Sequence, residues 1–151
     1  MRRAAALLSC TALLALAACG GEKEEHISFV ASEANLAAGY PFSELVEEDG
    51  RIYLSGTLGV APGTMTLVDG GVEAESRQIM ENIKATLESH GLGMDRIVKC
   101  TVMIDDMADW PAFNSIYAEY FEPGRFPARS AFGADGLALG AALEVECMAR
   151  R

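Results

Sequence analysis

The sequence predicts an α+β fold with two layers, in which two helices cover one face of a mixed β-sheet. The predicted elements follow the order β-β-β-α-β-α-β-β in 151 residues, a length typical of one domain. Half of the residues (50%) are apolar, so a packed core can form without a metal or a disulfide framework. The chain offers no further elements for a third layer, so one face of the sheet would remain uncovered.

The first three strands are predicted from short apolar runs and their turns. The sequence HISFV at 26–30 is typical of a short strand. The stretch SELVEEDGRIYLSG at 43–56 predicts a hairpin, because Asp49-Gly50 is a pair that tight turns prefer. The following residues, 57–71, are rich in turn formers and are predicted to be a loop.

Two helices flank the fourth strand. The first is predicted from about Val72 to His90, with its stripe of buried positions at helical spacing. Alternating residues at 96–106 predict a strand with Val98, Cys100, Val102 and Ile104 on one face. Asp109 is expected to cap the second helix, with Pro111 in its first turn and a stop at 122–124. In the first of these two helices, 72–90, the residues expected to face the core are Val72, Ser76, Ile79, Ile83 and Leu87.

The last two strands are FPARSAFG at 126–133 and AALEVECMA at 141–149, joined by a glycine-containing loop. They leave a second sheet face that no helix covers. Its expected apolar members are Phe126, Phe132, Met103 and Met148. Symmetric assembly with further copies of the chain would cover this face, so an oligomer is predicted.

Residues 1–18 are identified as a signal peptide. They combine the basic start MRR with an apolar stretch too short to be a stable membrane anchor. The stretch ends in LAAC at 16–19, which resembles the bacterial lipobox and implies cleavage before Cys19 and lipidation of its thiol. Residues 19–26 would then be a tether, and 27–151 the folded domain, anchored at the cell envelope and facing the periplasm. An ordinary secretory signal and an uncleaved membrane segment are the alternatives.

Cys100 and Cys147 are the two cysteines inside the predicted domain. Each lies in a strand-like run, and we expect two buried free thiols; an exported protein could also oxidise such a pair to a disulfide. Neither a CxxC motif nor a Cys/His spacing suggests a metal, so no metal and no cofactor are expected. The net charge of −10 argues against nucleic acid as a partner.

Three polar residues are candidates for chemistry, although each has an ordinary structural explanation. Arg129 lies among small and apolar neighbours, but most arginines simply form ion pairs at a surface or interface. Glu144 alternates with apolar residues and could belong to a solvated strand face, and Asn114 could be a polar surface residue of the second helix. From the residues alone the three are only suggestive.

Several segments together resemble the RidA/YjgF family of imine deaminases. They are YLSG at 53–56, IVKCTVMIDDMADWPAFNSIYAEYF at 97–121, FPARS at 126–130 and the closing LEVE with its final Arg-Arg. The resemblance covers roughly 41–151, with the order and spacing of the segments kept. It implies a chorismate-mutase-like fold, a homotrimer with clefts between subunits, and hydrolysis of reactive 2-imino or enamine acids to 2-keto acids and ammonia without a cofactor.

The resemblance also assigns expected roles to residues. Arg129 matches the arginine that binds the substrate carboxylate, and a guanidinium can hold a carboxylate with two parallel bonds. Glu144 matches the acid beside the attacking water, which a carboxylate can orient and deprotonate. Asn114 and Ser55 match polar positions of the cleft.

Three positions depart from the best-known branch of the family. Ala131 replaces a cysteine whose backbone faces the ligand, Phe42 replaces a tyrosine, and Thr57 stands where glutamine is usual. These changes bear on the substrate more than on the fold. Three hypotheses follow: an imine deaminase at the envelope, a module that binds a small carboxylate without turnover, and a purely structural membrane-anchored trimer.

Overall fold

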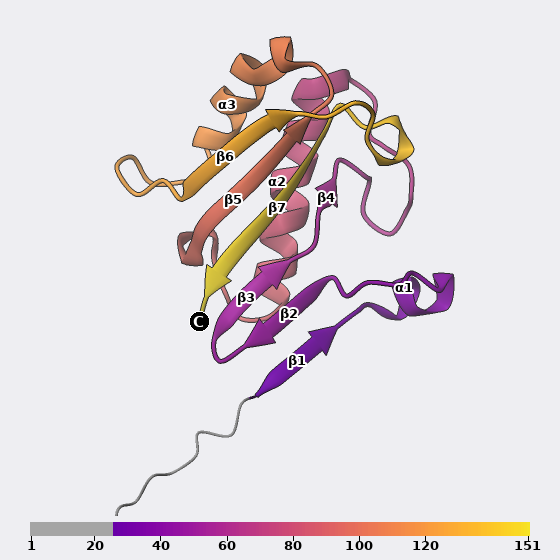
Figure 1. Ribbon diagram of the computed structural model, residues 1–151, viewed down its shortest axis with the longest axis vertical. Coiled ribbons are helices and arrows are strands. Elements are labelled where there is room, and N and C mark those ends of the chain that lie inside the picture. The colour runs from indigo at the N-terminus through magenta and orange to yellow at the C-terminus, as the bar shows by residue number, and fades with distance from the viewer. Residues whose placement is uncertain (1–25) are drawn as a thin grey trace, which may run out of the picture.

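The computed structural model describes residues 26–151, and these residues form one mixed sheet with helices against it (Figure 1). The strand order is β1-β2-β3-β7-β5-β6, and the short β4 pairs with β7 beyond the end of β3. The α+β class is confirmed. The strands are β1 (Ile27–Val30), β2 (Leu45–Glu48), β3 (Arg51–Leu54), β4 (Thr57–Leu58), β5 (Ile97–Ile104), β6 (Ala128–Gly133) and β7 (Leu143–Arg150). The α-helices are α1 (Glu33–Ala38), α2 (Gly71–Ser89) and α3 (Trp110–Ala118).

The predicted hairpin is confirmed as β2 and β3. Glu48 pairs with Arg51, and the two residues between them, Asp49 and Gly50, have φ angles of 48° and 77°. Positive φ at both central positions gives the turn whose twist matches that of the strands. The sheet continues from this hairpin to the antiparallel pair β3–β7 and ends in the parallel pair β5–β6.

Helices α2 and α3 lie on one face of the sheet and enclose the core with it (Figure 1). The buried face of α2 contains the expected Ser76, Ile79, Ile83 and Leu87. It also contains Glu75, a carboxylate that is only 6% exposed. Its Oε2 accepts the N–H of Ala142 at 2.9 Å, which fixes the chain just before β7 begins.

Helix α1 is an element that the sequence analysis did not predict. Ser32 caps its N-terminus by accepting the Asn35 N–H at 3.3 Å, and Gly39 ends it with a φ of 71°. A serine and a glycine that bracket six residues are the usual signals for a short helix. The helix is only 6 residues long and has no buried member, so the apolar periodicity that revealed α2 is missing.

Two details of the predicted elements differ from expectation. Val98 is 47% exposed instead of facing the core, because the register of β5 against β7 shifts between Ile97 and Lys99 and turns Ile97 inward. Asp109 precedes α3 but makes no capping bond with its side chain; Asp106 instead accepts the Ala108 N–H at 2.8 Å one turn earlier.

The expectation of two free thiols is wrong, because a disulfide joins Cys100 to Cys147. The two residues lie directly opposite each other on β5 and β7, with their Cα atoms 4.1 Å apart. The alternation of each strand had correctly indicated that both side chains point into the core. A sequence pattern shows which face a cysteine occupies, but it does not show the register that places two cysteines opposite each other.

The other face of the sheet has no helix over it and is partly apolar. Phe132 on β6 and Phe126 just before it are each 51% exposed, and Met103 and Met148 are partly buried on β5 and β7. Among the described helices, none combines the length and apolar character needed to cross a bilayer. The signal peptide, the tether residues up to 25 and the proposed lipidation site Cys19 lie outside the described residues.

Candidate functional site

Arg129 lies on β6, the strand at one edge of the sheet, and its side chain reaches the helix layer. Its Nη2 donates a hydrogen bond to Asn114 Oδ1 on α3 at 2.6 Å. Its guanidinium carbon lies 4.5 Å from the ring centroid of Trp110 and 4.5 Å from that of Tyr117. Two aromatic faces and one amide thus hold the cation in place, and the remaining N–H groups are available to a ligand.

The aromatic rings beside Arg129 are a stable apolar support. Tyr117 is almost fully buried between Phe113 and Phe121, and burial raises the pKa of its phenol to about 12. Tyr117 therefore stays neutral at physiological pH, and within residues 26–151 no acidic side chain forms an ion pair with Arg129. An arginine in this setting is well suited to an anionic group such as a carboxylate.

Glu144 lies on β7 and faces the side of the sheet that the helices leave open. Its neighbours Leu143 and Val145 are fully buried in the core, so the alternation of the strand turns Glu144 the other way. The carboxylate packs against Gly56, where an added Cβ would collide with Glu144 Oε1. Partial burial raises the pKa of Glu144 above its ordinary value, and the negative charge of the nearby Glu146 raises it further.

Arg129 and Glu144 of one chain therefore lie on opposite faces of the sheet. Arg129 pairs in register with Cys100, whose side chain is in the core, whereas Glu144 pairs with Met103 on the open face. A small ligand cannot contact both groups within one chain. The predicted site is thus present as two separate halves.

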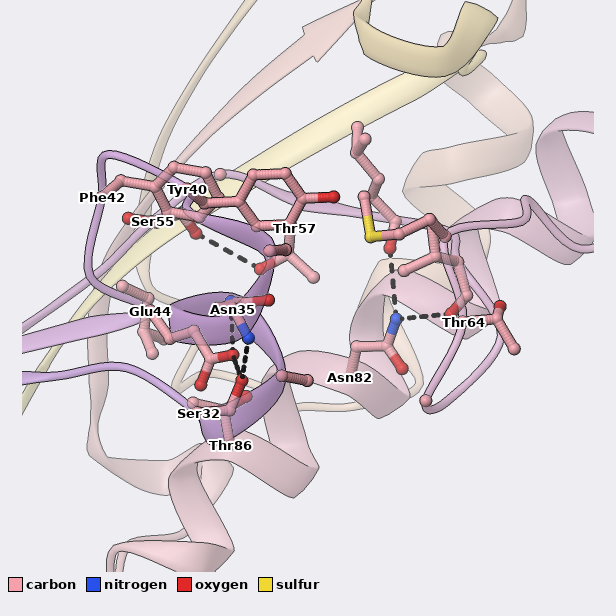
Figure 2. Close-up of a pocket in the computed structure, with 18 residues that line it drawn as sticks. Ser32, Asn35, Tyr40, Phe42, Glu44, Ser55, Thr57, Thr64, Asn82 and Thr86 are labelled. Atoms are coloured by element: carbon pink, nitrogen blue, oxygen red, sulfur yellow. Dashed lines mark hydrogen bonds between the residues drawn. The ribbon is translucent and has the colours of Figure 1, made fainter.

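A pocket of about 460 Å³ lies beside the Glu144 half (Figure 2). Phe42 and Ser55, both predicted for the cleft, line it together, and so does Gly56, against which Glu144 packs. The Ser55 hydroxyl donates to the Ser43 carbonyl at 2.6 Å, which orders the loop in front of β2. Phe42 is half-exposed and stacks on Tyr40 with ring centroids 5.6 Å apart.

The predicted residues thus fall into two groups. Arg129 and Asn114 touch each other, and Ala131, two positions along β6, packs against the core beneath them. Phe42 and Ser55 line one pocket together with Gly56, and Gly56 in turn contacts the Glu144 carboxylate.

The contacts of the Trp110 and Tyr117 rings with Arg129 and the polar lining of the pocket were not predicted from the sequence. The two rings were detectable in principle, because Trp110 and Tyr117 lie four residues before and three after Asn114, on one face of α3. The residues Asn35 and Glu44 gave no such signal, because α1 brings them together only after folding. Within residues 26–151 no group of three His, Cys, Asp or Glu side chains is arranged to hold a metal.

This chain is similar to a known family and to several characterised proteins. The family model described as endoribonuclease L-PSP matches residues 32–151. Two curated relatives are the chloroplastic reactive intermediate deaminase A of Arabidopsis thaliana and the 2-iminobutanoate/2-iminopropanoate deaminase of Mus musculus. The first is 38% identical over 80% of this chain and 64% of its own, just under two thirds of its length. The second is 39% identical over 72% of this chain and 80% of its own.

The chain belongs to the RidA family. A solved structure supports the same conclusion. It is the structure of a Yersinia pestis protein of unknown function from the conserved Rid protein family. It has a TM-score of 0.76, with 34% identity over 83% of this chain and 100% of its own. The RidA-like fold expected from the sequence is therefore confirmed.

Proposed function

We propose that this RidA family member hydrolyses 2-imino acids, and their enamine tautomers, to 2-keto acids and ammonia. The observation that supports it best is the guanidinium of Arg129, held by two rings and Asn114 with donors left for a carboxylate. Relatives at 38–39% identity include the mouse 2-iminobutanoate/2-iminopropanoate deaminase and the Arabidopsis reactive intermediate deaminase A. The activity of those proteins is extended to this chain as part of the proposal.

The reaction begins with binding of the substrate carboxylate by Arg129. The imine nitrogen, once protonated, makes its carbon electrophilic, and water adds to that carbon to give a carbinolamine. Glu144 orients this water and takes its proton, a task for which a carboxylate must be ionised. Glu144 then passes this proton to the amino nitrogen, the C–N bond breaks and ammonia leaves, while the hydroxyl loses its proton and becomes the carbonyl of the keto acid.

The two half-sites require more than one copy of the chain. Arg129 from one copy and Glu144 from a neighbour would meet where the open sheet face of one packs against the other. The half-exposed Phe132 and Phe126 are apolar surface that such packing would bury. The assembly is proposed to be a homotrimer with three clefts, each between two subunits.

The raised pKa of Glu144 predicts the acidic limb of the pH profile. Activity requires the carboxylate, so kcat/KM should fall as the pH drops through a pKa above the ordinary 4.5 of glutamate. Glu146→Gln removes the neighbouring negative charge, which lowers the Glu144 pKa, and should move this limb to lower pH. Measuring kcat/KM against pH for both proteins checks this; a limb that stays in place would show that Glu144 does not set it.

A coupled assay tests the proposed activity directly. An amino-acid oxidase generates imino acids in the presence of semicarbazide, which traps the imine as a semicarbazone. The protein should slow semicarbazone formation by diverting the imine to the keto acid. Unchanged semicarbazone formation with imines from several amino acids would reject the deaminase proposal.

Binding without turnover is the alternative function. It is favoured by the same Arg129 environment, which would hold a small carboxylate even if Glu144 activated no water. Action on RNA, which the description of the family model names, has no support in the charge of the chain. At −10 the protein would repel a polyanion.

The location is proposed to be the cell envelope, with lipid on Cys19. The disulfide between Cys100 and Cys147 supports an exported protein, because such bonds persist in oxidising compartments. Mass spectrometry of the protein isolated from membranes should find an acylated Cys19 as the first residue and Cys100 joined to Cys147. An unmodified chain that still begins with Met1 would contradict this location.

A further inference from the structure

The pocket beside Glu144 is built from parts of the chain that lie far apart in the sequence. Helix α1 with Tyr40 and Phe42 forms one side, and the loop that includes Thr64 forms the opposite side (Figure 2). The base includes Asn82 of α2, whose Nδ2 donates to the carbonyls of Leu58 and Val60 at 3.2 and 2.9 Å. The walls are thus tied to the helix layer and to β4.

Glu44 is the acidic group of this pocket. Its Oε1 accepts hydrogen bonds from Ser32 Oγ and from Asn35 Nδ2, each at 2.6 Å. Neither bond uses Oε2, and no Lys, Arg or His among residues 26–151 forms an ion pair with Glu44. The carboxylate is therefore fixed in position and lacks a cationic partner.

The rest of the lining also favours a cation. Of the 18 lining residues, all within the described range, none is basic and Glu44 is the one acid. Tyr40 and Phe42 add two stacked aromatic rings, whose faces attract cations. Thr57 contributes only a small side chain to the lining, and the pocket volume of about 460 Å³ is large enough for a long substituent.

The pocket is adjacent to the proposed chemistry. Gly56 lines it and at the same time contacts the Glu144 carboxylate. With its imine carbon near Glu144, a substrate would have to pass its side chain by Gly56 to reach Glu44.

We propose that this pocket receives a substrate side chain ending in a cation, so that the preferred substrates are 2-imino acids with a terminal guanidinium or ammonium group. This inference rests on the proposed deaminase activity. The chemistry at the imine is unchanged, and the pocket determines which imine is hydrolysed. Glu44 acts as a specificity residue that binds the distant cation.

The test compares two imino acids generated by the same oxidase, one from L-arginine and one from L-norleucine. Arginine is a better probe than lysine, because the terminal amine of the lysine-derived imino acid would attack the imine carbon of the same molecule and form a ring. The wild-type protein should prefer the arginine-derived imine in kcat/KM. Glu44→Gln keeps an acceptor for Ser32 and Asn35 but removes the charge. It should reduce the preference by about tenfold or more, the usual effect of losing a charged hydrogen-bond partner.

Glu33→Gln is the matched control. Glu33 is the first residue of α1, is exposed and does not line the pocket, so the same change of charge should leave the preference unaltered. A wild-type protein that hydrolyses both imines equally, or a preference that survives Glu44→Gln, would overturn the inference while leaving deamination intact.

Calorimetry with the two corresponding keto acids separates this inference from the proposed activity. The keto acid of arginine should bind more tightly than that of norleucine, and Glu44→Gln should abolish the difference. If neither imine is hydrolysed but this binding difference is found, the deaminase proposal fails and the cation pocket stands. If both keto acids bind equally well, or neither binds, the cation pocket is rejected.

Discussion

Replacing Arg129 by alanine is expected to reduce kcat/KM for imine hydrolysis by about thirtyfold or more, because truncating a charge in a desolvated pair costs about 2–5 kcal/mol. The substitution removes the group that binds the substrate carboxylate. It also frees Asn114 Oδ1 and uncovers the rings of Trp110 and Tyr117. The semicarbazide assay, run over a range of substrate concentrations, measures the loss.

Two further variants give this experiment its controls. Arg129→Lys keeps the positive charge but cannot form two parallel bonds to a carboxylate, so activity should remain low. Arg125→Ala removes an exposed arginine from the same segment, where its partner Glu122 is 3.8 Å away, and should leave activity unchanged. Full activity in Arg129→Ala, with the fold verified by circular dichroism, would contradict the role of Arg129.

The same variant distinguishes catalysis from binding alone. If the protein only binds carboxylates, calorimetry should detect keto-acid binding that disappears in Arg129→Ala while no imine is consumed by the wild type. If the protein is only a structural assembly, no keto acid should bind to either form. Met148→Asp, which places a charge on the open sheet face, would then be the more damaging change.

The fold was largely predictable because its main elements have strong local patterns. Helix α2 and the strands β5 and β7 bury alternate or helically spaced apolar residues, and the β2–β3 turn has the residues that positive φ requires. Helix α1 was not predicted because it buries no residue. The disulfide was not predicted because cross-strand register depends on the whole sheet.

The site was predictable in its residues but not in its geometry. The family motifs identified Arg129, Glu144 and Asn114, and the contact between Arg129 and Asn114 fits their expected roles. The pattern LEVE could also have indicated that Glu144 faces away from the core. That Arg129 faces the opposite way follows from the register that pairs it with the core residue Cys100, and the rings of α3 then hold its guanidinium. The pocket at Glu44 depends on contacts between α1 and β2 that have no sequence motif.

The opposite placement of Arg129 and Glu144 leads to a second large expected effect, the recovery of activity from two inactive proteins. Arg129→Ala and Glu144→Gln should each be nearly inactive alone. When they are co-expressed, some interfaces pair the intact Arg129 of one chain with the intact Glu144 of another. For random mixing in equal amounts, about one quarter of the interfaces are intact, whatever the number of subunits in a closed ring.

The measurement is the activity of the co-purified mixture, with native mass spectrometry to verify that mixed oligomers are present. A mixture of Arg129→Ala with a chain that has both substitutions contains no intact interface and should remain inactive. If mixed oligomers form and activity does not return, both groups must act from one chain. Because β6 and β7 present Arg129 and Glu144 to opposite faces, that result would require a ligand that reaches around the sheet edge. Recovery to about a quarter of wild-type activity would instead establish that each site draws its carboxylate-binding group and its water-orienting group from different copies.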